Sequence, residues 1–310
     1  MKRQIFAMLT ALLLLAVLGA ASAEEADSGA WLDVTLYFRY GDTAYLGTEG
    51  TRIDLRQEDT VATLIVRRLI EGPQASHDRL SGLFPRDTQV ISARTEGDTA
   101  YVTLNSAFLG KPDGAPADWE ERDAWKKEAA LRRRLAFQSI VLALTEDGRC
   151  QRVQLYIAED DDAVPQRLSI SWFDPTQENE EIRLAACGRD DSLVITPKLA
   201  LSLVLQGWQQ KDWEAVWPFI SHAERGAPES YSVFRQRMEQ ESAVLLSWQV
   251  SAGSVSVSGR NATVVLDGKI RLEDGSVREL TRMAVPLFRE EENWVLSAEN
   301  LLELMGEEEL

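Results

Sequence analysis

The chain has 310 residues, of which 45% are hydrophobic and 27% charged, and this composition excludes disordered, collagen-like and multispan membrane classes. Its net charge of −17 argues against a nucleic-acid partner, because neutralising phosphates needs clustered Lys and Arg. With two histidines, His77 and His222, sites built from several imidazoles are also excluded.

The first residues have the layout of a Sec signal peptide. Two basic residues precede an apolar run from Ile5 to Gly19, and small residues that suit signal peptidase follow it. We therefore predict a signal peptide over residues 1–23, cleaved between Ala23 and Glu24.

An uncleaved membrane anchor is the alternative to this signal peptide. The apolar run can be extended to Ala23, which approaches the roughly 18 residues that span a bilayer. The Ala/Ser/Gly-rich end of the run favours cleavage, and no Cys stands near it to carry a lipid. We expect an extracytoplasmic protein, secreted or in the cell envelope, with no stable membrane span after cleavage.

The first half of the chain predicts an α+β layer of two helices against one mixed sheet. Alternating residues and turn signals place strands at 31–39, 45–55, 88–93, 100–104 and 153–157, and helices at 60–72 and 119–145. The first helix has Asp59-Thr60 as its N-cap and stops at Gly72-Pro73. The second is densely apolar from Leu135 to Leu144, so we expect that portion to be buried.

Five segments of this half carry a family resemblance: Thr35–Phe38, Leu69–Pro73, Leu83–Thr88, Ala100–Phe108 and Val153–Ile157. In order and spacing they resemble the GerMN domain, which is named for a sporulation and germination protein of spore-forming bacteria. The resemblance covers about residues 31–160. It implies scaffolding and assembly in the cell envelope and no catalytic residues. Members are often lipoproteins, whereas this chain lacks the lipobox Cys.

Residues 161–194 are predicted to be the tail of the first domain plus a linker. Acidic clusters at 159–162 and 178–181 lack the spaced oxygens and the glycine of an EF-hand loop. We therefore expect solvated loops there and no metal site.

Cys150 and Cys187 are the two cysteines of the chain. Outside the cytoplasm such a pair can oxidise, so a disulfide clasping residues 151–186 is predicted as an option, and two unpaired thiols are the alternative.

Residues 195–310 predict three helices followed by a meander of strands. Helices are expected from Pro197, from Trp213 and over 231–241, and strands at 245–250, 254–257, 262–266, 278–287 and 294–297. The Gln210–Trp213 and Glu292–Leu296 segments resemble the nuclear-transport-factor-2-like fold, an α+β cone. The whole chain is then α+β with two domains, each a curved mixed or antiparallel sheet packed by two or three helices.

The sequence contains few candidates for catalysis. His77 and His222 lie in polar loops, and no G-x-S-x-G elbow, G-x-G-x-x-G run or P-loop occurs, so we predict no catalytic residue, no enzyme and no cofactor. Most tryptophans fall at core positions. Trp119 and Trp172 are the ones we expect to be exposed.

Two functions follow from these observations. The first is an exported non-catalytic scaffold or adaptor in sporulation, germination or cell-envelope assembly, with other envelope or sporulation proteins as partners and self-association as a further option. The alternative is an extracytoplasmic binding module that holds a small ligand or a cell-wall fragment in its C-terminal cone. A cone filled by its own aromatic side chains would favour the adaptor, and a polar pocket would favour the binding module.

Overall fold

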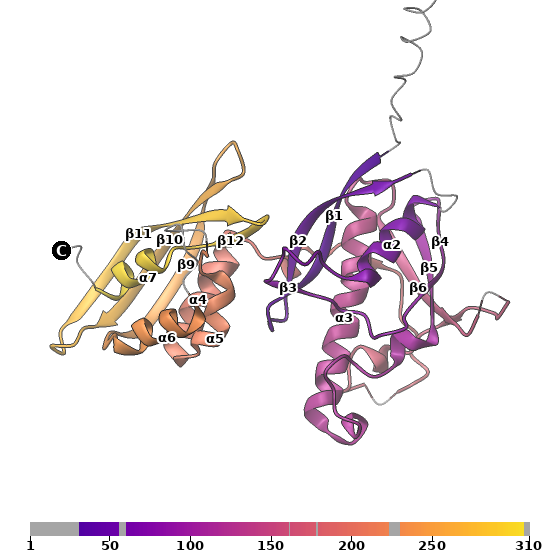
Figure 1. The fold of residues 1–310 in the computed structure, drawn as a ribbon, viewed down its shortest axis with the longest axis horizontal. Helices are drawn as coiled ribbons and strands as arrows, with labels where there is room; N and C mark the ends of the chain where they lie inside the picture. Colours follow the sequence, from indigo (N-terminus) through magenta and orange to yellow (C-terminus); the bar gives the residue numbers. More distant parts are fainter. Residues whose placement is uncertain (1–30, 56–59, 161, 178, 223–229, 307–310) are drawn as a thin grey trace, which may run out of the picture.

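The computed structural model describes residues 31–55, 60–160, 162–177, 179–222 and 230–306 (Figure 1). The signal peptide and its Ala23–Glu24 cleavage site lie outside these residues and stay predictions. Within the described ranges, no helix combines the length and apolar character needed to cross a membrane.

The N-terminal part, as we call residues 31–190, contains eight strands and two α-helices among the described residues. They are β1 (Trp31–Tyr40), β2 (Leu46–Asp54), α2 (Val61–Glu71), β3 (Leu80–Ser81), β4 (Val90–Glu96), β5 (Thr99–Asn105), α3 (Asp123–Thr145), β6 (Arg152–Ala158), β7 (Gln166–Arg167) and β8 (Cys187–Gly188). The predicted order of strands and helices is confirmed, with short strands added.

These strands form two sheets instead of the one mixed sheet that the pattern predicted. One sheet has the order β2-β1-β3 and the other β4-β5-β6-β7, with β8 also paired to β6; β5 and β6 run parallel. Helices α2 and α3 contact strands of both sheets and lie between them (Figure 1). The cause is visible in α3, whose residues 135–145 are buried on every side. A helix that is apolar all round needs cover from two directions.

The limits of α2 match the signals in the sequence. The Thr60 side chain accepts a hydrogen bond from the backbone N–H of Thr63 at 3.1 Å, which caps the first turn. Gly72 ends the helix at φ 92°, a conformation that favours glycine, and its N–H donates to the carbonyl of Leu69.

The two tryptophans expected at the surface, Trp119 and Trp172, differ in their solvent exposure. Trp172 is 39% exposed, as predicted, whereas Trp119 is 8% exposed and the prediction for it was wrong. Trp119 begins a short 3-10 turn, Trp119–Glu121, that precedes α3. There its ring packs with Ala115 and Ala129, so the loop before the helix folds back over it.

The C-terminal part, residues 191–306, is a helical layer on an antiparallel meander. Its elements are α4 (Pro197–Gln210), α5 (Trp213–Val216), α6 (Tyr231–Gln240), β9 (Val244–Val255), β10 (Asn261–Arg271), β11 (Val277–Glu290), β12 (Asn293–Val295) and α7 (Ala298–Met305). The sheet order is β12-β11-β10-β9. The two strands predicted at 245–250 and 254–257 are one bulged strand, and α7 was not predicted.

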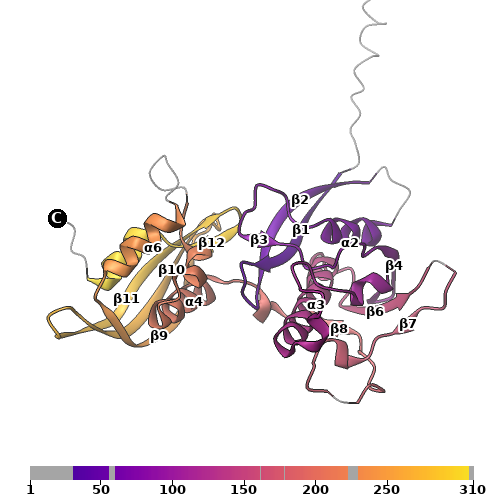
Figure 2. The ribbon, with the colours of Figure 1, turned by 60° about the horizontal axis from the view of Figure 1, so that its bottom comes forward.

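Side chains of this part fill the concave side of its own sheet. Helix α4 packs on β9 and β10 (Figure 2), and its Val204 and Leu205 are fully buried. Phe234 of α6 and Leu266 of β10 are also fully buried. Each such side chain contributes about 1.5–3 kcal/mol of burial free energy, so these contacts hold the helices on the sheet.

The division into domains stays a prediction. The expected limits were 31–160 and 195–310, but β7 and β8 pair with β6 and so extend the second sheet into the predicted tail and linker. A continuous cluster of buried side chains also runs through both parts. The α+β class is confirmed.

Candidate functional site

The two parts meet at Tyr40, the last residue of β1. Its hydroxyl donates a hydrogen bond to the Pro218 carbonyl at 2.5 Å, and its ring centroid lies 4.9 Å from that of Phe219. Tyr40 and Phe219 are both fully buried. Burial raises the pKa of Tyr40 far above its ordinary value, so the hydroxyl keeps its proton and stays a donor.

A buried ion pair lies next to this contact. Arg79 donates to Glu290 at 2.8 Å and to the Ile220 carbonyl at 3.1 Å, and the two charged side chains are 2% and 15% exposed. The hydroxyl of Ser221 donates to the other carboxylate oxygen at 2.7 Å, and the backbone N–H of His222 donates at 3.2 Å. Both oxygens of Glu290 are therefore hydrogen-bonded, as a carboxylate out of water requires.

The protonation state of Glu290 follows from these contacts. Burial alone would raise its pKa, but the hydrogen bonds from Ser221 and Arg79 outweigh burial and hold the pKa below its ordinary value. Glu290 is therefore a carboxylate at neutral pH and compensates the charge of Arg79.

A second set of hydrogen bonds joins β2 to Asn293 of β12, to the adjacent Glu292 and to Ile195 before α4. The side chain of Asn293 accepts from the backbone N–H of Thr48 at 3.0 Å and donates to the Thr48 carbonyl at 3.2 Å. The backbone N–H of Gly50 donates to Glu292, and Ile195 N–H donates to the Leu46 carbonyl at 2.9 Å. Together with Arg79 and Tyr40, these bonds fix the C-terminal part against the β1–β2 hairpin.

His222 belongs to this junction. Its ring stacks on Trp217 with centroids 4.4 Å apart, and its Nδ1 lies 3.7 Å from a carboxylate oxygen of Asp78. Burial and then the charge of Arg79 lower the pKa of His222, although Asp78 and Glu290 oppose them. At neutral pH the ring is therefore neutral and packs as an aromatic side chain.

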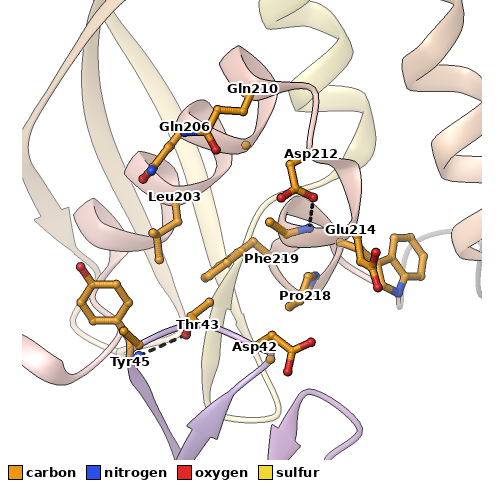
Figure 3. A pocket seen from close by; sticks show the side chains of 15 residues that line it. Asp42, Thr43, Tyr45, Leu203, Gln206, Gln210, Asp212, Glu214, Pro218 and Phe219 are labelled. Atoms are coloured by element: carbon orange, nitrogen blue, oxygen red, sulfur yellow. Dashed lines mark hydrogen bonds between the residues drawn. The ribbon is translucent and has the colours of Figure 1, made fainter. Parts of the chain in front are cut away.

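An open cleft of about 800 Å³ lies beside the junction (Figure 3). The β1–β2 turn forms one wall, and α4, α5 and the segment after α5 form the other; the lining side chains include Asp42, Thr43, Tyr45, Leu203, Gln206, Gln210, Asp212, Glu214, Trp217, Pro218 and Phe219. Because the walls come from both parts, the contacts of Tyr40 and Arg79 also set the width of the cleft.

The cleft is acidic. Asp42, Asp212 and Glu214 line it, and no Lys, Arg or His is among its lining residues in the described structure. Asp212 caps α5 by accepting from the Ala215 N–H at 3.1 Å. In Figure 3 the three carboxylates lie to one side of the cleft and Tyr45 to the other. The arrangement can attract a cation through one wall while an apolar group contacts the half-buried Leu203 and Pro218.

Aromatic stacking can contribute less than charge to recognition in this cleft. One face of the Trp217 ring is covered by His222, and Tyr231 and Phe234 lie at centroid distances of 5.8 and 5.3 Å. Phe219 is fully buried. A sugar platform needs a free aromatic face, so charge is the stronger recognition element here.

Both cysteines are free thiols in the structure, so the predicted disulfide stays a prediction. Cys150 is buried and its thiol donates to the Leu144 carbonyl at 3.1 Å, whereas Cys187 is half-buried and opposite Val153 in the β6–β8 pairing. Burial raises the pKa of both thiols.

No group of three or more His, Cys, Asp or Glu is placed to hold a metal ion within the residues that the structure describes. Of the acidic clusters considered for Ca²⁺, Asp161 and Glu178 lie outside those residues. The neighbouring Glu180 and Glu181 are exposed.

No sequence pattern indicated the junction. Arg79 follows a polar loop and Glu290 begins an acidic run, so each looked like an ordinary surface charge. The Asn293 of the segment that resembled the NTF2-like fold was noted for layout alone, yet it makes the reciprocal bonds to Thr48.

Comparison with known families supports the resemblance of the first half. Residues 35–161 match the family model Germane, described as sporulation and spore germination. No curated protein matches the chain.

Three solved structures among the matches are distant. The tandem GerMN domains of the sporulation protein GerM from Bacillus subtilis share 20% identity, covering 56% of this chain and 50% of that one, at a TM-score of 0.35. A putative lipoprotein from Clostridium perfringens shares 14% identity over 56% and 97% of the two chains (TM-score 0.28). An NTF2-like protein from Cytophaga hutchinsonii shares 12% over 33% and 86% (TM-score 0.23). TM-scores this low do not establish a shared fold, so nothing about this chain is concluded from the three structures.

Proposed function

We propose that this protein is an exported, non-catalytic adaptor that works in sporulation or germination through contacts with other envelope proteins. The match of residues 35–161 to a family described as sporulation and spore germination supports the process. The predicted signal peptide supports the compartment. Adaptor function requires surfaces held in a fixed relation and no reactive group.

The observation that carries this proposal is the junction. Tyr40 and the Arg79–Glu290 pair lock two α+β parts together through buried contacts, and an open cleft lies beside them. Ligand sites occur preferentially at such boundaries. The concave side of the C-terminal sheet is filled by α4 and Phe234, which favours the adaptor over a module that holds a ligand inside its cone.

The chemistry of the cleft suggests the kind of partner segment. Asp42 and Glu214 add negative charge, no cationic side chain is among the described lining residues, and the half-buried Leu203 and Pro218 supply apolar contact. A basic residue flanked by apolar ones on a partner protein fits this wall best, since opposite charges speed encounter and fix register.

Site-specific photo-cross-linking in sporulating cells tests the proposal. A photoreactive amino acid replaces Gln206 in the cleft, and the matched control places it at Gln177, which is exposed in the N-terminal part. We expect one defined envelope protein to cross-link from position 206 and not from 177. Asp42→Asn with Glu214→Gln should reduce that product severalfold and lower the yield of germination-competent spores.

Two results would contradict this function. The first is equal cross-linking of the same protein from both positions, since the cleft would then not be the contact. The second is turnover of peptidoglycan by the purified chain that a single carboxylate substitution abolishes, because that outcome would make the protein an enzyme. Replacing His77 and His222 together should leave any cross-link to the partner in place.

A further inference from the structure

The side chain of Arg39, near the end of β1, contacts the turn that forms one wall of the cleft. Its Nε donates to the Thr43 carbonyl at 2.8 Å, and its Nη2 donates to the Asp42 carbonyl at 2.9 Å. Arg39 is 5% exposed, whereas Asp42 lies at the surface. One buried cation therefore holds two successive carbonyls of a surface turn.

Helix α3 holds the guanidinium of Arg39 from the other side. Nη1 of Arg39 donates to Glu128 at 2.5 Å, and the same carboxylate oxygen accepts from Nε of Arg132 at 2.6 Å. Arg132 also donates to the Asp113 carbonyl at 2.9 Å. Hydrogen bonds between charged groups are stronger than neutral ones. The β1–β2 turn is therefore tied to α3 through the three nitrogens of Arg39.

The turn has hydrogen bonds of its own besides those from Arg39. The backbone N–H and the hydroxyl of Thr43 both donate to the Tyr40 carbonyl, at 3.2 and 2.6 Å. The backbone N–H of Tyr45 donates to the Thr43 hydroxyl at 3.2 Å. Carbonyls at the surface can be hydrated, and burying a cation is costly, so closing the turn does not require an arginine. What Arg39 adds is a fixed orientation of the peptide groups after Asp42 and Thr43.

This orientation matters for the cleft because the turn contributes its lining. Asp42, Thr43 and Tyr45 line the cleft from the turn (Figure 3). Arg39 is not among the described lining residues, so its own charge does not contact a group bound there. Any effect of Arg39 on recognition therefore passes through the turn, and above all through the carboxylate of Asp42.

We propose that Arg39 is a positioning residue for recognition in the cleft, because it holds the turn so that the Asp42 carboxylate stays in the acidic wall with Asp212 and Glu214. This role rests on the proposed function, in which a basic segment of a partner binds that wall. A carboxylate that is already in place spares the complex the entropy of ordering a turn, so the partner binds more tightly.

Arg39→Lys in the full chain tests this role. The substitution keeps the charge, but one nitrogen cannot reach three acceptors that lie around a planar guanidinium. The matched control is Arg133→Lys, since Arg133 is 6% exposed and also donates to two successive carbonyls, those of Leu109 at 2.7 Å and Gly110 at 3.4 Å. None of these three residues is among the described lining of the cleft.

Hydrogen exchange of the purified chain is the first measurement. In Arg39→Lys the amides of Thr43 and Tyr45 should exchange about tenfold faster than in the wild type, because lost bonds from a charged donor loosen the turn. In Arg133→Lys the same two amides should exchange at the wild-type rate. Glu128→Gln is a milder second variant that keeps Arg39 and removes the charge that orients it, and it should shift the exchange in the same direction by less.

Photo-cross-linking from position 206 is the second measurement, with each substitution added to the chain that carries the photoreactive residue there. Arg39→Lys should reduce the partner product severalfold although Asp42 and Glu214 are retained, and Arg133→Lys should leave it unchanged. Both substitutions should lower the melting temperature, so a residue that only stabilises the fold would give the same product in the two variants.

Three results would overturn this role. Unchanged exchange at Thr43 and Tyr45 in Arg39→Lys would show that the arginine does not hold the turn. Faster exchange with an undiminished cross-link would show that the order of the turn does not serve recognition, and an equal loss of product in Arg133→Lys would show that stability alone is responsible. A wild-type chain that gives no product from position 206 would contradict the proposed function, while the exchange result still decides whether Arg39 holds the turn.

Discussion

Arg79 and Glu290 are 211 residues apart in the sequence and meet at 2.8 Å inside the junction between the two parts. Neither side chain has much access to water, and the Ser221 hydroxyl completes the hydrogen bonding of the carboxylate. A charge in such a place is tolerated only while its partner is present. The relative position of the two parts therefore depends on Arg79 and Glu290. The shape of the cleft depends on them too, because its walls come from both parts.

Replacing Glu290 by Gln should lower the free energy of unfolding by about 3 kcal/mol, because the buried guanidinium of Arg79 then keeps only the more exposed carboxylate of Glu291, 3.7 Å away, as a counter-charge. Urea denaturation followed by tryptophan fluorescence measures the loss. The control is Glu239→Gln, which breaks the exposed pair with Arg235 and should leave the free energy of unfolding nearly unchanged.

A double variant separates the charge from the packing. Arg79→Met combined with Glu290→Leu removes both charges and should be less destabilised than Glu290→Gln alone. If Glu290→Gln costs no more than the Glu239→Gln control, the pair does not hold the junction.

The junction should also weaken in acid. The folded-state pKa of His222 lies below its ordinary value of 6.5, so the unfolded chain binds the proton more readily. Stability is therefore full above about pH 6.5 and falls as the pH drops below it. Glu290, whose pKa also lies below its ordinary 4.5, adds a second loss in the same direction below about that pH. Thermal unfolding at a series of pH values measures both steps.

His222→Gln isolates the first of these steps. Glutamine does not titrate, so the variant should lose part of the fall in melting temperature between pH 7 and pH 5 while keeping the fall below pH 4.5. An unchanged pH profile in the variant would show that protonation of His222 is not linked to unfolding.

Local signals predicted the elements of this fold well. Thr60 and Gly72 bound α2 because capping and a left-handed glycine are properties of a few neighbouring residues. The burial of residues 135–144 followed from their dense apolar character, which Gln138 and Ser139 interrupt only briefly. Such local properties can be recognised in a short segment without knowing the rest of the chain.

Long-range features were not predictable in the same way. Whether the strands around α3 form one sheet or two depends on which face of the helix each strand covers, and the apolar pattern is equal on all faces. Trp119 was expected at the surface because it does not fall at a core position of the predicted elements, but a fold-back against Ala129 buries it. The contact of Arg79 with Glu290 joins two segments that each look solvated on their own.

The two thiols should differ in reactivity. In the reduced chain at pH 8, iodoacetamide should modify Cys187 before Cys150, because Cys187 is half-buried and Cys150 is buried. Both should react more slowly than a free thiol, since burial raises the pKa of each. Peptide mass spectrometry at timed intervals gives the order, and modification of Cys150 first would contradict the burial in the structure.

The predicted disulfide is tested on exported protein that has not been reduced. A bond between Cys150 and Cys187 would make both thiols unreactive until a reductant is added, and the intact mass would be lower by two hydrogen atoms. Rapid alkylation without reductant would show that the clasp is absent.

Arg133 of α3 offers a test of a buried cation held by aromatic rings. Its guanidinium lies 5.7 Å from the Trp119 ring centroid and 4.9 Å from that of Trp172, and it donates to the Leu109 carbonyl at 2.7 Å. Burial lowers its pKa to about 10. Arg133→Lys keeps the charge but loses the planar group that stacks between rings and donates from several nitrogens. We expect a loss of about 1–2 kcal/mol in the free energy of unfolding.

The neighbouring Arg134 is exposed, so Arg134→Lys is the matched control and should be neutral within about 0.5 kcal/mol in the same urea titration. Equal effects of the two substitutions would mean that the stacking of Arg133 contributes nothing to stability.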